Sequence, residues 1–393
     1  MLYVVQGALR GNRPRDIIRR STIIAMISFL TLIDLFGSQA LLPQIVDQFG
    51  ASTGVVGFAV NAATLGMAVS GLTVAYFADR IDRKKGIWVC LALLSVPTAL
   101  LSATDSIWVF AALRVAQGVL MAAAFTLTMT YISEQCDIMA VGGAMAAYIT
   151  GNVASNLFGR LLAVSTAEIA GLSGSFLAFA TLNLIGAALS FILIGPRDAS
   201  PPRQATPPLE AWRLHWSDPA LRASFAIGFL ILFIFVGVFT YVNPLLVDTL
   251  GVPVMYLGVV YLVFVPAIFT TPMAGSVVKR MGPRRTLQAS MSVALVALAL
   301  TLVSSLTLVL VALAVIGAAT FFAQASATGF VSSRAKSDQA AANGLYLTSY
   351  YLGGLAGALL LGQVHTQLGW EGTVAFLILA TMFCIFTARV MKD

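Results

Sequence analysis

Charged side chains are scarce in this chain of 393 residues, where Asp, Glu, Lys and Arg together make up only 10%. A soluble protein usually carries about 25% charged residues. Hydrophobic residues account for 59% of the chain, and the mean hydropathy is +0.91. Segment length excludes an apolar soluble protein, because a buried soluble helix seldom needs more than ~14 apolar residues in a row, whereas a bilayer crossing needs ~20. We therefore expect an integral membrane protein.

Cysteine and histidine are also rare, with three and two residues. Cys90, Cys136 and Cys384 show neither a disulfide framework nor metal-ligand spacing, so we expect them to be packing residues. His215 falls in a polar linker and His365 in an outer loop, and neither neighbours a plausible nucleophile. The sequence also lacks paired carboxylates and a Walker loop. We expect no enzyme, no metal, no cofactor and no ATP drive.

Long apolar runs recur along the chain and predict an all-α protein with twelve transmembrane helices. Five arginines follow the mildly apolar first nine residues, which is the wrong order for a cleavable signal peptide, so the first span is expected to be an uncleaved anchor. The expected spans lie near 21–42, 54–78, 86–103, 107–131, 138–165, 172–195, 222–246, 254–278, 286–304, 307–329, 339–362 and 371–389.

The two halves of the chain resemble each other at an offset of about 200 residues, which indicates a parallel repeat. The small residue, arginine and basic cluster of 75–85 recur at 275–285, and Tyr148 with Thr150 matches Tyr346 with Thr348. A Pro-rich polar stretch separates the halves. We predict two pseudo-symmetric six-helix bundles at 1–195 and 221–393, joined by a cytoplasmic linker at 196–220, with the site between them near the midplane.

The placement of charge predicts the orientation. If there are twelve spans, Lys and Arg precede the first span, follow spans two, six, eight and ten, and end the chain. The opposite loops contain acids such as Asp105 and Glu168 and no cation. This positive-inside pattern places both termini in the cytoplasm. Because the cations are divided among short loops and do not gather on one face, nucleic acid is not an expected partner.

Three formal charges fall inside the expected spans: Asp34, Arg114 and Arg160. Such a group costs on the order of 3 kcal/mol at bilayer depth, so it needs a partner or a water-filled cavity. Asp34 lies about 12 Å and Arg114 about 10 Å from the outer ends of their spans, so the two can share one level. We interpret them as proton-coupling residues: Arg114 holds Asp34 ionised until substrate or water disturbs the pair, and Asp34 then takes a proton. A static ion pair, or an Arg114 that only braces backbone carbonyls, is the alternative.

Other polar and aromatic side chains inside the spans are candidates for lining a substrate pathway. Packing is the alternative for each of them, and Arg160 could instead anchor its helix at the interface. Small residues four apart in the fifth span, including Gly151 and Gly159, are interpreted as a packing face. The pathway candidates are Gln39, Asn61, Gln117, Asn152, Asn156 and Arg160 in the first half, and Tyr241, Asn243, Gln324, Tyr346 and Tyr350 in the second.

Two motifs carry a family resemblance. Asp79-Arg80-x-x-Arg83-Lys84 resembles the loop signature of the major facilitator superfamily, and Arg114-Val-Ala-Gln117-Gly118 resembles its fourth-span motif. Strings in spans five and eleven are similar to bacterial inner-membrane exporters of the YnfM and arabinose-efflux-permease type. The sequence departs at Ala75 and Asp82, where the loop motif prefers Gly, and at Asn156, where the closest relatives more often have Gly. The resemblance covers nearly the whole chain.

The resemblance implies a monomeric secondary transporter of the inner membrane, with a small molecule, protons and the lipid bilayer as partners. It implies proton-coupled efflux, or antiport, of a sugar, nucleoside or drug-like compound by alternating access. Symport or facilitated uptake is the alternative, and a non-transporting membrane sensor a weaker one. Asp79 is expected to latch the outward-open state at the N-terminus of a helix from the other half, with Arg80, Arg83 and Lys84 bracing the loop.

Overall fold

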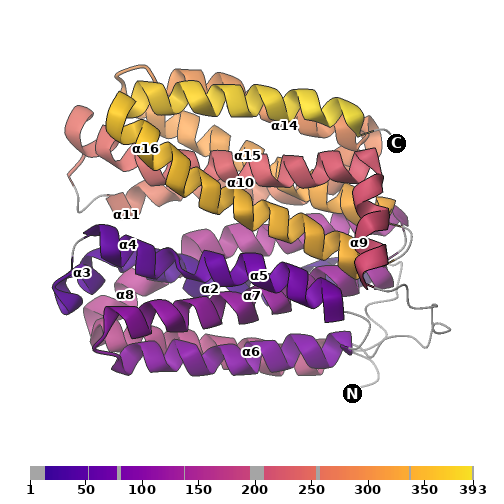
Figure 1. Ribbon diagram of the computed structural model, residues 1–393, viewed down its shortest axis with the longest axis horizontal. Coiled ribbons are helices and arrows are strands. Elements are labelled where there is room, and N and C mark those ends of the chain that lie inside the picture. Colours follow the sequence, from indigo (N-terminus) through magenta and orange to yellow (C-terminus); the bar gives the residue numbers. More distant parts are fainter. Residues whose placement is uncertain are drawn as a thin grey trace.

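The computed structural model describes residues 14–51, 53–77, 81–136, 138–194, 208–253, 257–335 and 338–391, and every regular element within these ranges is a helix. The all-α class predicted from the apolar runs is therefore confirmed. Figure 1 shows the helices of the first half as one layer, in indigo to pink, beneath those of the second half, in red to yellow.

The first half contains six long helical passages, two of which are interrupted. A break after Ala40 separates α2 from α3, and one after Asn61 separates α4 from α5. Asp82 caps α6, because its carboxylate accepts a hydrogen bond from the backbone N–H of Lys85 at 2.8 Å. The elements are α2 (Pro14–Ala40), α3 (Leu42–Phe49), α4 (Thr53–Asn61), α5 (Ala63–Phe77), α6 (Arg83–Leu100), η3 (Leu101–Ala103), α7 (Ile107–Gln135) and α8 (Ile138–Leu193).

The second half follows a short connecting helix, α9 (Pro208–Ser217), and begins with α10 (Pro219–Pro244). Asp218 caps α10 through the N–H of Ala220 at 2.8 Å, and Pro219 occupies the first helical position. Its remaining elements are η4 (Leu245–Thr249), α11 (Leu257–Val260), η6 (Tyr261–Phe264), α12 (Val265–Thr270), η7 (Thr271–Met273), α13 (Ala274–Met281), α14 (Pro283–Leu300), α15 (Leu306–Arg334), α16 (Gln339–Thr387) and η8 (Ala388–Val390).

Two of the helices reverse direction at a glycine. The backbone leaves helical geometry at Gly171 (φ 69°) in α8 and at Gly369 (φ 64°) in α16, and both angles suit glycine because it has no Cβ. Among the described residues, nine helical segments are long and apolar enough to cross a membrane, and two of these exceed 50 residues and contain the glycine turns. The predicted count of twelve crossings stays a prediction.

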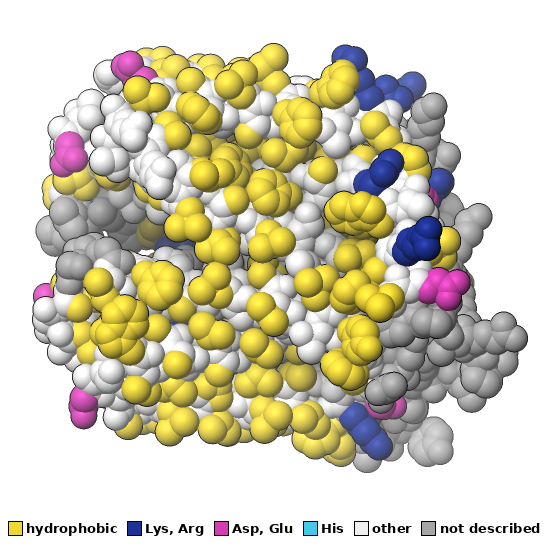
Figure 2. All heavy atoms as spheres, viewed as in Figure 1, with side chains coloured by type: hydrophobic (Ala, Val, Ile, Leu, Met, Phe, Trp, Pro, Cys, Tyr) yellow, Lys and Arg dark blue, Asp and Glu magenta, His cyan; other side chains and the backbone are white. Residues whose placement is uncertain are grey.

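The two ends of the molecule differ in charge. We call the end that carries α9 the linker end; α2 begins there and α16 ends there (Figure 1). The opposite end, which includes Asp105 and Glu168, is the far end. In Figure 2 most Lys and Arg side chains gather near the linker end, while apolar side chains cover the lateral surface. Exposed Leu93, Val96 and Phe191 belong to this apolar surface, which suits contact with lipid chains.

The halves meet closely at the linker end. A Cβ added to Gly275 of α13 would lie 2.7 Å from the Cα of Gly143 in α8, so the backbones themselves are in contact there. Asn343 of α16 donates to Ser133 Oγ of α7 at 3.2 Å, also across the halves. Figure 2 shows a hollow between the halves at the far end. The described residues of the two halves are therefore in close contact at the linker end.

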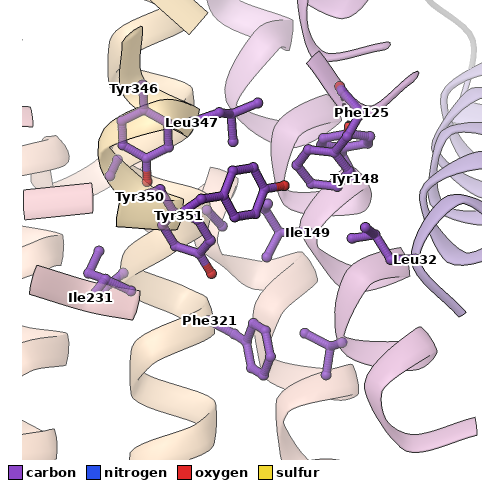
Figure 3. Packing of buried hydrophobic residues seen from close by; sticks show 14 of the residues in the cluster. Leu32, Phe125, Tyr148, Ile149, Ile231, Phe321, Tyr346, Leu347, Tyr350 and Tyr351 are labelled. Atoms are coloured by element: carbon purple, nitrogen blue, oxygen red, sulfur yellow. Dashed lines mark hydrogen bonds between the residues drawn. The ribbon is translucent and has the colours of Figure 1, made fainter. Parts of the chain in front are cut away.

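An aromatic cluster fills the middle of the molecule (Figure 3). Tyr346, Tyr350 and Tyr351 of α16 face Phe125 of α7 and Tyr148 of α8. The ring centroids of Tyr346 and Tyr350 are 6.2 Å apart and those of Phe125 and Tyr148 are 4.3 Å apart. These rings bring apolar surface with polar tips to the interface between the halves.

Candidate functional site

Asp34 is fully buried within the first half and is surrounded by neutral donors. One carboxylate oxygen, Oδ2, accepts hydrogen bonds from Thr98 Oγ1 at 3.2 Å, Gln117 Nε2 at 3.2 Å and Asn183 Nδ2 at 3.3 Å. These partners lie on α6, α7 and the second arm of α8, so four helical passages converge on one acid. The other oxygen, Oδ1, is buried without a partner.

Arg114 lies beside this acid but does not pair with it directly. Its Nη1 donates to Gln117 Oε1 at 2.7 Å, and its Nε donates to the carbonyl oxygen of Val60 at 3.0 Å. Asp34 and Arg114, both described, have no ion-pair contact within 4.0 Å. Gln117 separates the two charges because its amide offers an acceptor to one and a donor to the other. The predicted common level is correct, but the pairing is indirect, and Arg114 also braces a backbone carbonyl.

The carbonyl that Arg114 holds is at a helix break. Val60 lies in the last turn of α4, and the helical hydrogen-bonding ladder is interrupted before α5 begins at Ala63. A carbonyl at a helix C-terminus lacks an intrahelical donor, so a guanidinium N–H can satisfy it. Arg114 therefore connects the Asp34 network to the α4–α5 break, and α5 in turn packs against α16 of the other half.

Arg160 centres a second polar group nearer the far end. Its Nη2 donates to Gln39 Oε1 at 2.8 Å and its Nε to Asn156 Oδ1 at 3.1 Å. Gln39 Nε2 in turn donates to Asn61 Oδ1 at 3.1 Å. The guanidinium carbon of Arg160 lies 4.0 Å from the ring centroid of Tyr261, which belongs to the second half. The structure thus joins three predicted pathway residues, Gln39, Asn61 and Asn156, to the fourth, Arg160.

The remaining pathway candidates of the first half lie on helix faces next to these groups. Asn152 lies one and two turns from Asn156 and Arg160 on α8, and its Oδ1 is buried without a partner. Gln117 belongs to the Asp34 network and is completely buried. The neighbouring small-residue face packs on α2: a Cβ on Gly151 or Gly159 would collide with a carbonyl oxygen of that helix. The packing interpretation of that face is confirmed.

In the second half, two pathway candidates have buried polar atoms without a hydrogen-bond partner, and a third is hydrogen-bonded to the backbone. Tyr346 has a buried hydroxyl without a partner, and both amide atoms of Gln324 are buried without one. Tyr241 donates its hydroxyl to the carbonyl of Ala358 and stacks on His365 at 5.4 Å. Tyr350 is buried in the aromatic cluster, while Asn243 is half-buried. These residues do not converge with Arg160 into one hydrogen-bonded group.

The predicted latch is only partly covered by the structure. Asp79 and Arg80 lie outside the described residues. Arg83 is buried and forms an ion pair with Glu134 of α7 at 3.0 Å, and its Nη1 donates to the carbonyl of Ile81 at 3.0 Å. Lys84 Nζ lies 5.3 Å from the ring centroid of Phe191. Arg83 therefore contacts the loop at Ile81 and also α7, while Lys84 contacts α8, and all of these partners belong to the first half.

Sequence reasoning missed three residues of these groups. Thr98 and Asn183 complete the Asp34 network, and Asn183 could have been noticed as a single amide in the long apolar run of 172–195. Thr98 follows Pro97 in an ordinary-looking span and carried no signal. Tyr261 could not be singled out either, because its role depends on the approach of Arg160 from the other half.

Comparison with known proteins identifies the family of this chain. Residues 24–357 and 259–392 match the family model of the Major Facilitator Superfamily. The inner membrane transport protein YnfM of Escherichia coli strain K12 is 28% identical over 385 residues, which cover 95% of this chain and 92% of YnfM. The MFS-type transporter YybF of Bacillus subtilis strain 168 is 26% identical, with 93% of this chain and 92% of YybF covered.

Solved structures share the fold at low sequence identity. The human organic anion transporter MFSD10 (TETRAN) superimposes with a TM-score of 0.81 at 16% identity, covering 96% of this chain and 100% of the other. The transporter FucP in its outward conformation gives a TM-score of 0.77 at 13% identity, covering 96% and 99%. Because the family model spans most of the sequence, this chain belongs to the Major Facilitator Superfamily and is a membrane transporter, not an enzyme.

Proposed function

We propose that the protein exports a small organic solute in exchange for protons, with Asp34 as the proton-carrying residue. The observation that carries this proposal is the complete burial of Asp34 among neutral donors, with Oδ1 lacking any partner. A buried polar atom without a hydrogen bond is costly, and a carboxylate can relieve that cost by taking a proton. An intramembrane acid in this position is a group built to change its charge.

The link from protonation to movement runs through Gln117 and Arg114. Protonation removes the negative charge of Asp34, which Gln117 connects to Arg114 by hydrogen bonds. The strength of the hydrogen bond from Arg114 to the Val60 carbonyl then changes. That carbonyl ends α4, and α5 forms much of the contact with α16 across the halves. Because a packed interface has discrete arrangements, a local change in charge can favour one of them.

The distribution of charge indicates which end of the protein faces the cytoplasm. With Lys and Arg gathered at the linker end, the positive-inside rule makes that end cytoplasmic and both termini internal. Closure at the linker end then means that this state faces outward, and in an exporter this is the state that releases the solute and takes up the proton. Two similar halves around a central site suit alternating access by rocking.

Proton release from inverted membrane vesicles tests the proposal. The vesicle interior is acidified, and sugars, nucleosides and drug-like compounds are added in turn while a trapped dye reports the internal pH. Antiport predicts a solute-triggered rise in internal pH that is abolished by Asp34→Asn. The matched control is Asp105→Asn at an exposed far-end position, which should behave as wild type.

The sign of the response distinguishes the alternatives. A solute-triggered fall in internal pH identifies symport, which is the mechanism of an uptake transporter. Solute flux without any proton movement identifies a facilitator. An Asp34→Asn variant that still accumulates solute against its gradient would exclude Asp34 as the coupling residue.

A further inference from the structure

Among the described residues, Arg160 differs from the other buried arginines in its surroundings. Arg83 is paired with Glu134, and Arg114 reaches Asp34 through a single amide. Arg160 is 9% exposed, it donates to the neutral amide oxygens of Gln39 and Asn156, and the polar tip of Tyr261 also lies close to it. No described carboxylate comes within ion-pair distance of it.

An uncompensated buried cation is expensive to maintain at bilayer depth. The amides and the aromatic rings of Tyr261 and Phe36, at 4.0 Å and 6.0 Å from the guanidinium carbon, solvate it but do not neutralise it. The described residues therefore leave room for a negative charge supplied by a ligand. A mobile anion that enters the hollow between the halves would supply it.

The geometry around Arg160 suits a carboxylate. Gln39 and Asn156 engage two of the five guanidinium N–H donors, and the ring centroid of Tyr261 lies 4.0 Å from the guanidinium carbon, so further N–H donors remain for a ligand. A planar guanidinium edge binds a carboxylate with two parallel hydrogen bonds. Two further polar atoms on the same face of α8, Asn156 Nδ2 and Asn152 Oδ1, are buried without a partner. They offer a donor and an acceptor to other groups of the same ligand.

The group is accessible from one side and continues into apolar surface on the other. Asn61, which is exposed, is joined to Arg160 through Gln39, so a polar path leads from the surface to the cation. In the other direction, Leu32, Phe36 and Gln39 follow one face of α2 at helical spacing. Figure 3 shows Leu32 near Tyr148, and both belong to the same buried hydrophobic cluster. A ligand held at Arg160 can therefore extend an apolar body along α2 towards this cluster.

We propose that Arg160, with Gln39 and Asn156, binds the carboxylate of an organic anion whose apolar or aromatic body lies along α2, and that Tyr261 of the opposite half covers this subsite. The inference rests on the proposed function, because it names the class of solute carried. It concerns recognition, and so it is independent of whether the proton moves with or against the solute.

Equilibrium binding to the full chain in lipid nanodiscs tests the proposal without any proton gradient. The probes are monocarboxylates from acetate to 2-naphthoate, each paired with its uncharged carboxamide. We expect 2-naphthoate to bind at least tenfold more tightly than 2-naphthamide and to raise the unfolding temperature. Arg160→Gln should abolish this preference, Arg160→Lys should keep part of it, and Arg285→Gln at an exposed position should keep all of it.

Chemical protection provides a test that requires no variant. Phenylglyoxal modifies arginine, and peptide mass spectrometry reports the modification of Arg160 alone. The carboxylate should slow modification of Arg160 several-fold, while the carboxamide should not. Equal binding of acid and amide, retention of the preference in Arg160→Gln, or no binding of any carboxylate to folded wild type overturns the proposal.

The outcome is separable from that of the coupling proposal. Asp34→Asn can change the affinity for both probes, but it should keep the preference for 2-naphthoate over 2-naphthamide, because that preference is set at Arg160. Carboxylate binding together with undiminished pumping by Asp34→Asn would leave the subsite standing and remove the coupling role. Coupled export of a neutral solute without any carboxylate binding would support the coupling role of Asp34 and overturn the carboxylate subsite at Arg160.

Discussion

The carboxylate of Asp34 and the guanidinium of Arg114 are joined through one side chain, the amide of Gln117, and make no direct ion pair. The amide accepts from Arg114 at 2.7 Å and donates to Asp34 at 3.2 Å. A direct pair of opposite charges would hold the acid ionised more firmly, because the Coulomb energy rises as the distance falls. The inserted amide leaves Asp34 closer to the point at which it can take a proton.

Replacement of Gln117 by Leu tests the bridge. The change leaves Arg114 Nη1 without its acceptor and removes one of the three donors to Asp34 Oδ2, so we expect the free energy of unfolding to fall by about 2 kcal/mol. Proton-coupled transport should fall at least tenfold. Thermal unfolding of purified protein and the vesicle assay measure the two effects. The control is Gln44→Leu at an exposed position of α3, and a Gln117→Leu variant that pumps as wild type would contradict the bridge.

The glycine contact between the halves predicts a conformational effect. Gly275→Ala places a Cβ 2.7 Å from the Cα of Gly143, so the backbones must separate at the linker end. We expect the closed arrangement to lose about 1–3 kcal/mol, a typical cost of overpacking. Spin labels at exposed Lys85 and Lys279, in a background without the three native cysteines, report the distance between the halves.

The control for this change is Gly57→Ala, where an added Cβ would meet nothing within 4 Å. It should leave the label distance unchanged, while Gly275→Ala should lengthen it. An unchanged distance in Gly275→Ala would show that the glycine contact does not limit closure.

A hydrogen bond from Asn343 also contributes to the contact between the halves at the linker end. Its Nδ2 donates to Ser133 Oγ at 3.2 Å, across the halves, within a fully buried setting. Asn343→Ala removes this bond, so we expect the closed arrangement to weaken by about 1 kcal/mol, or roughly fivefold in population. The same pair of labels measures it. Ser333→Ala is the control, because that hydroxyl bonds only within its own helix, to the Phe330 carbonyl, and an equal shift in both variants would contradict the prediction.

Asp218 predicts a pH dependence outside the membrane spans. Partial burial by itself would raise the pKa of Asp218, but hydrogen bonds from the Ala220 N–H and from Arg334, with the charge of Arg334, lower it below its ordinary value. A lowered pKa in the folded state stabilises the protein above the unfolded pKa, and this contribution is lost as the pH falls through the folded pKa.

Asp218→Asn should therefore lower the free energy of unfolding by up to about 1 kcal/mol at pH 7.5, since Asn still caps a helix but lacks the charge. The difference from wild type should shrink as the pH falls below about 4. Thermal unfolding at a series of pH values measures it. A difference that stays constant with pH would mean that the charge of Asp218 contributes nothing.

The helices and the location of the acid were predictable because each depends on short-range features. Apolar runs of bilayer length predict helices directly, since the backbone must satisfy its own hydrogen bonds in lipid. Asp34 could be singled out because a single acid in such a run has no other explanation than function or a partner. Gln117, in contrast, was assigned to the pathway, and the structure places it between Asp34 and Arg114 inside the first half.

The partners of these residues could not be predicted from the sequence. Thr98 and Asn183 reach Asp34 from helices that are 64 and 149 residues away along the chain. Helical periodicity indicates which residues share a face, but not how far each helix is rotated or shifted against its neighbours. The depth estimate for Asp34 and Arg114 therefore found a common level and missed the amide between them.

By itself, the sequence determined that this protein is an all-α membrane protein, that its halves repeat, and that one acid and two arginines lie inside its spans. These properties follow from composition, run length and spacing, which act locally along the chain. The tertiary structure alone decided that Arg114 reaches Asp34 through Gln117, that no described acid pairs with Arg160, and that Tyr261 of the other half lies against Arg160. Each of those contacts joins separate helices, and only the packing of complete helices sets the few ångströms on which charge pairing depends.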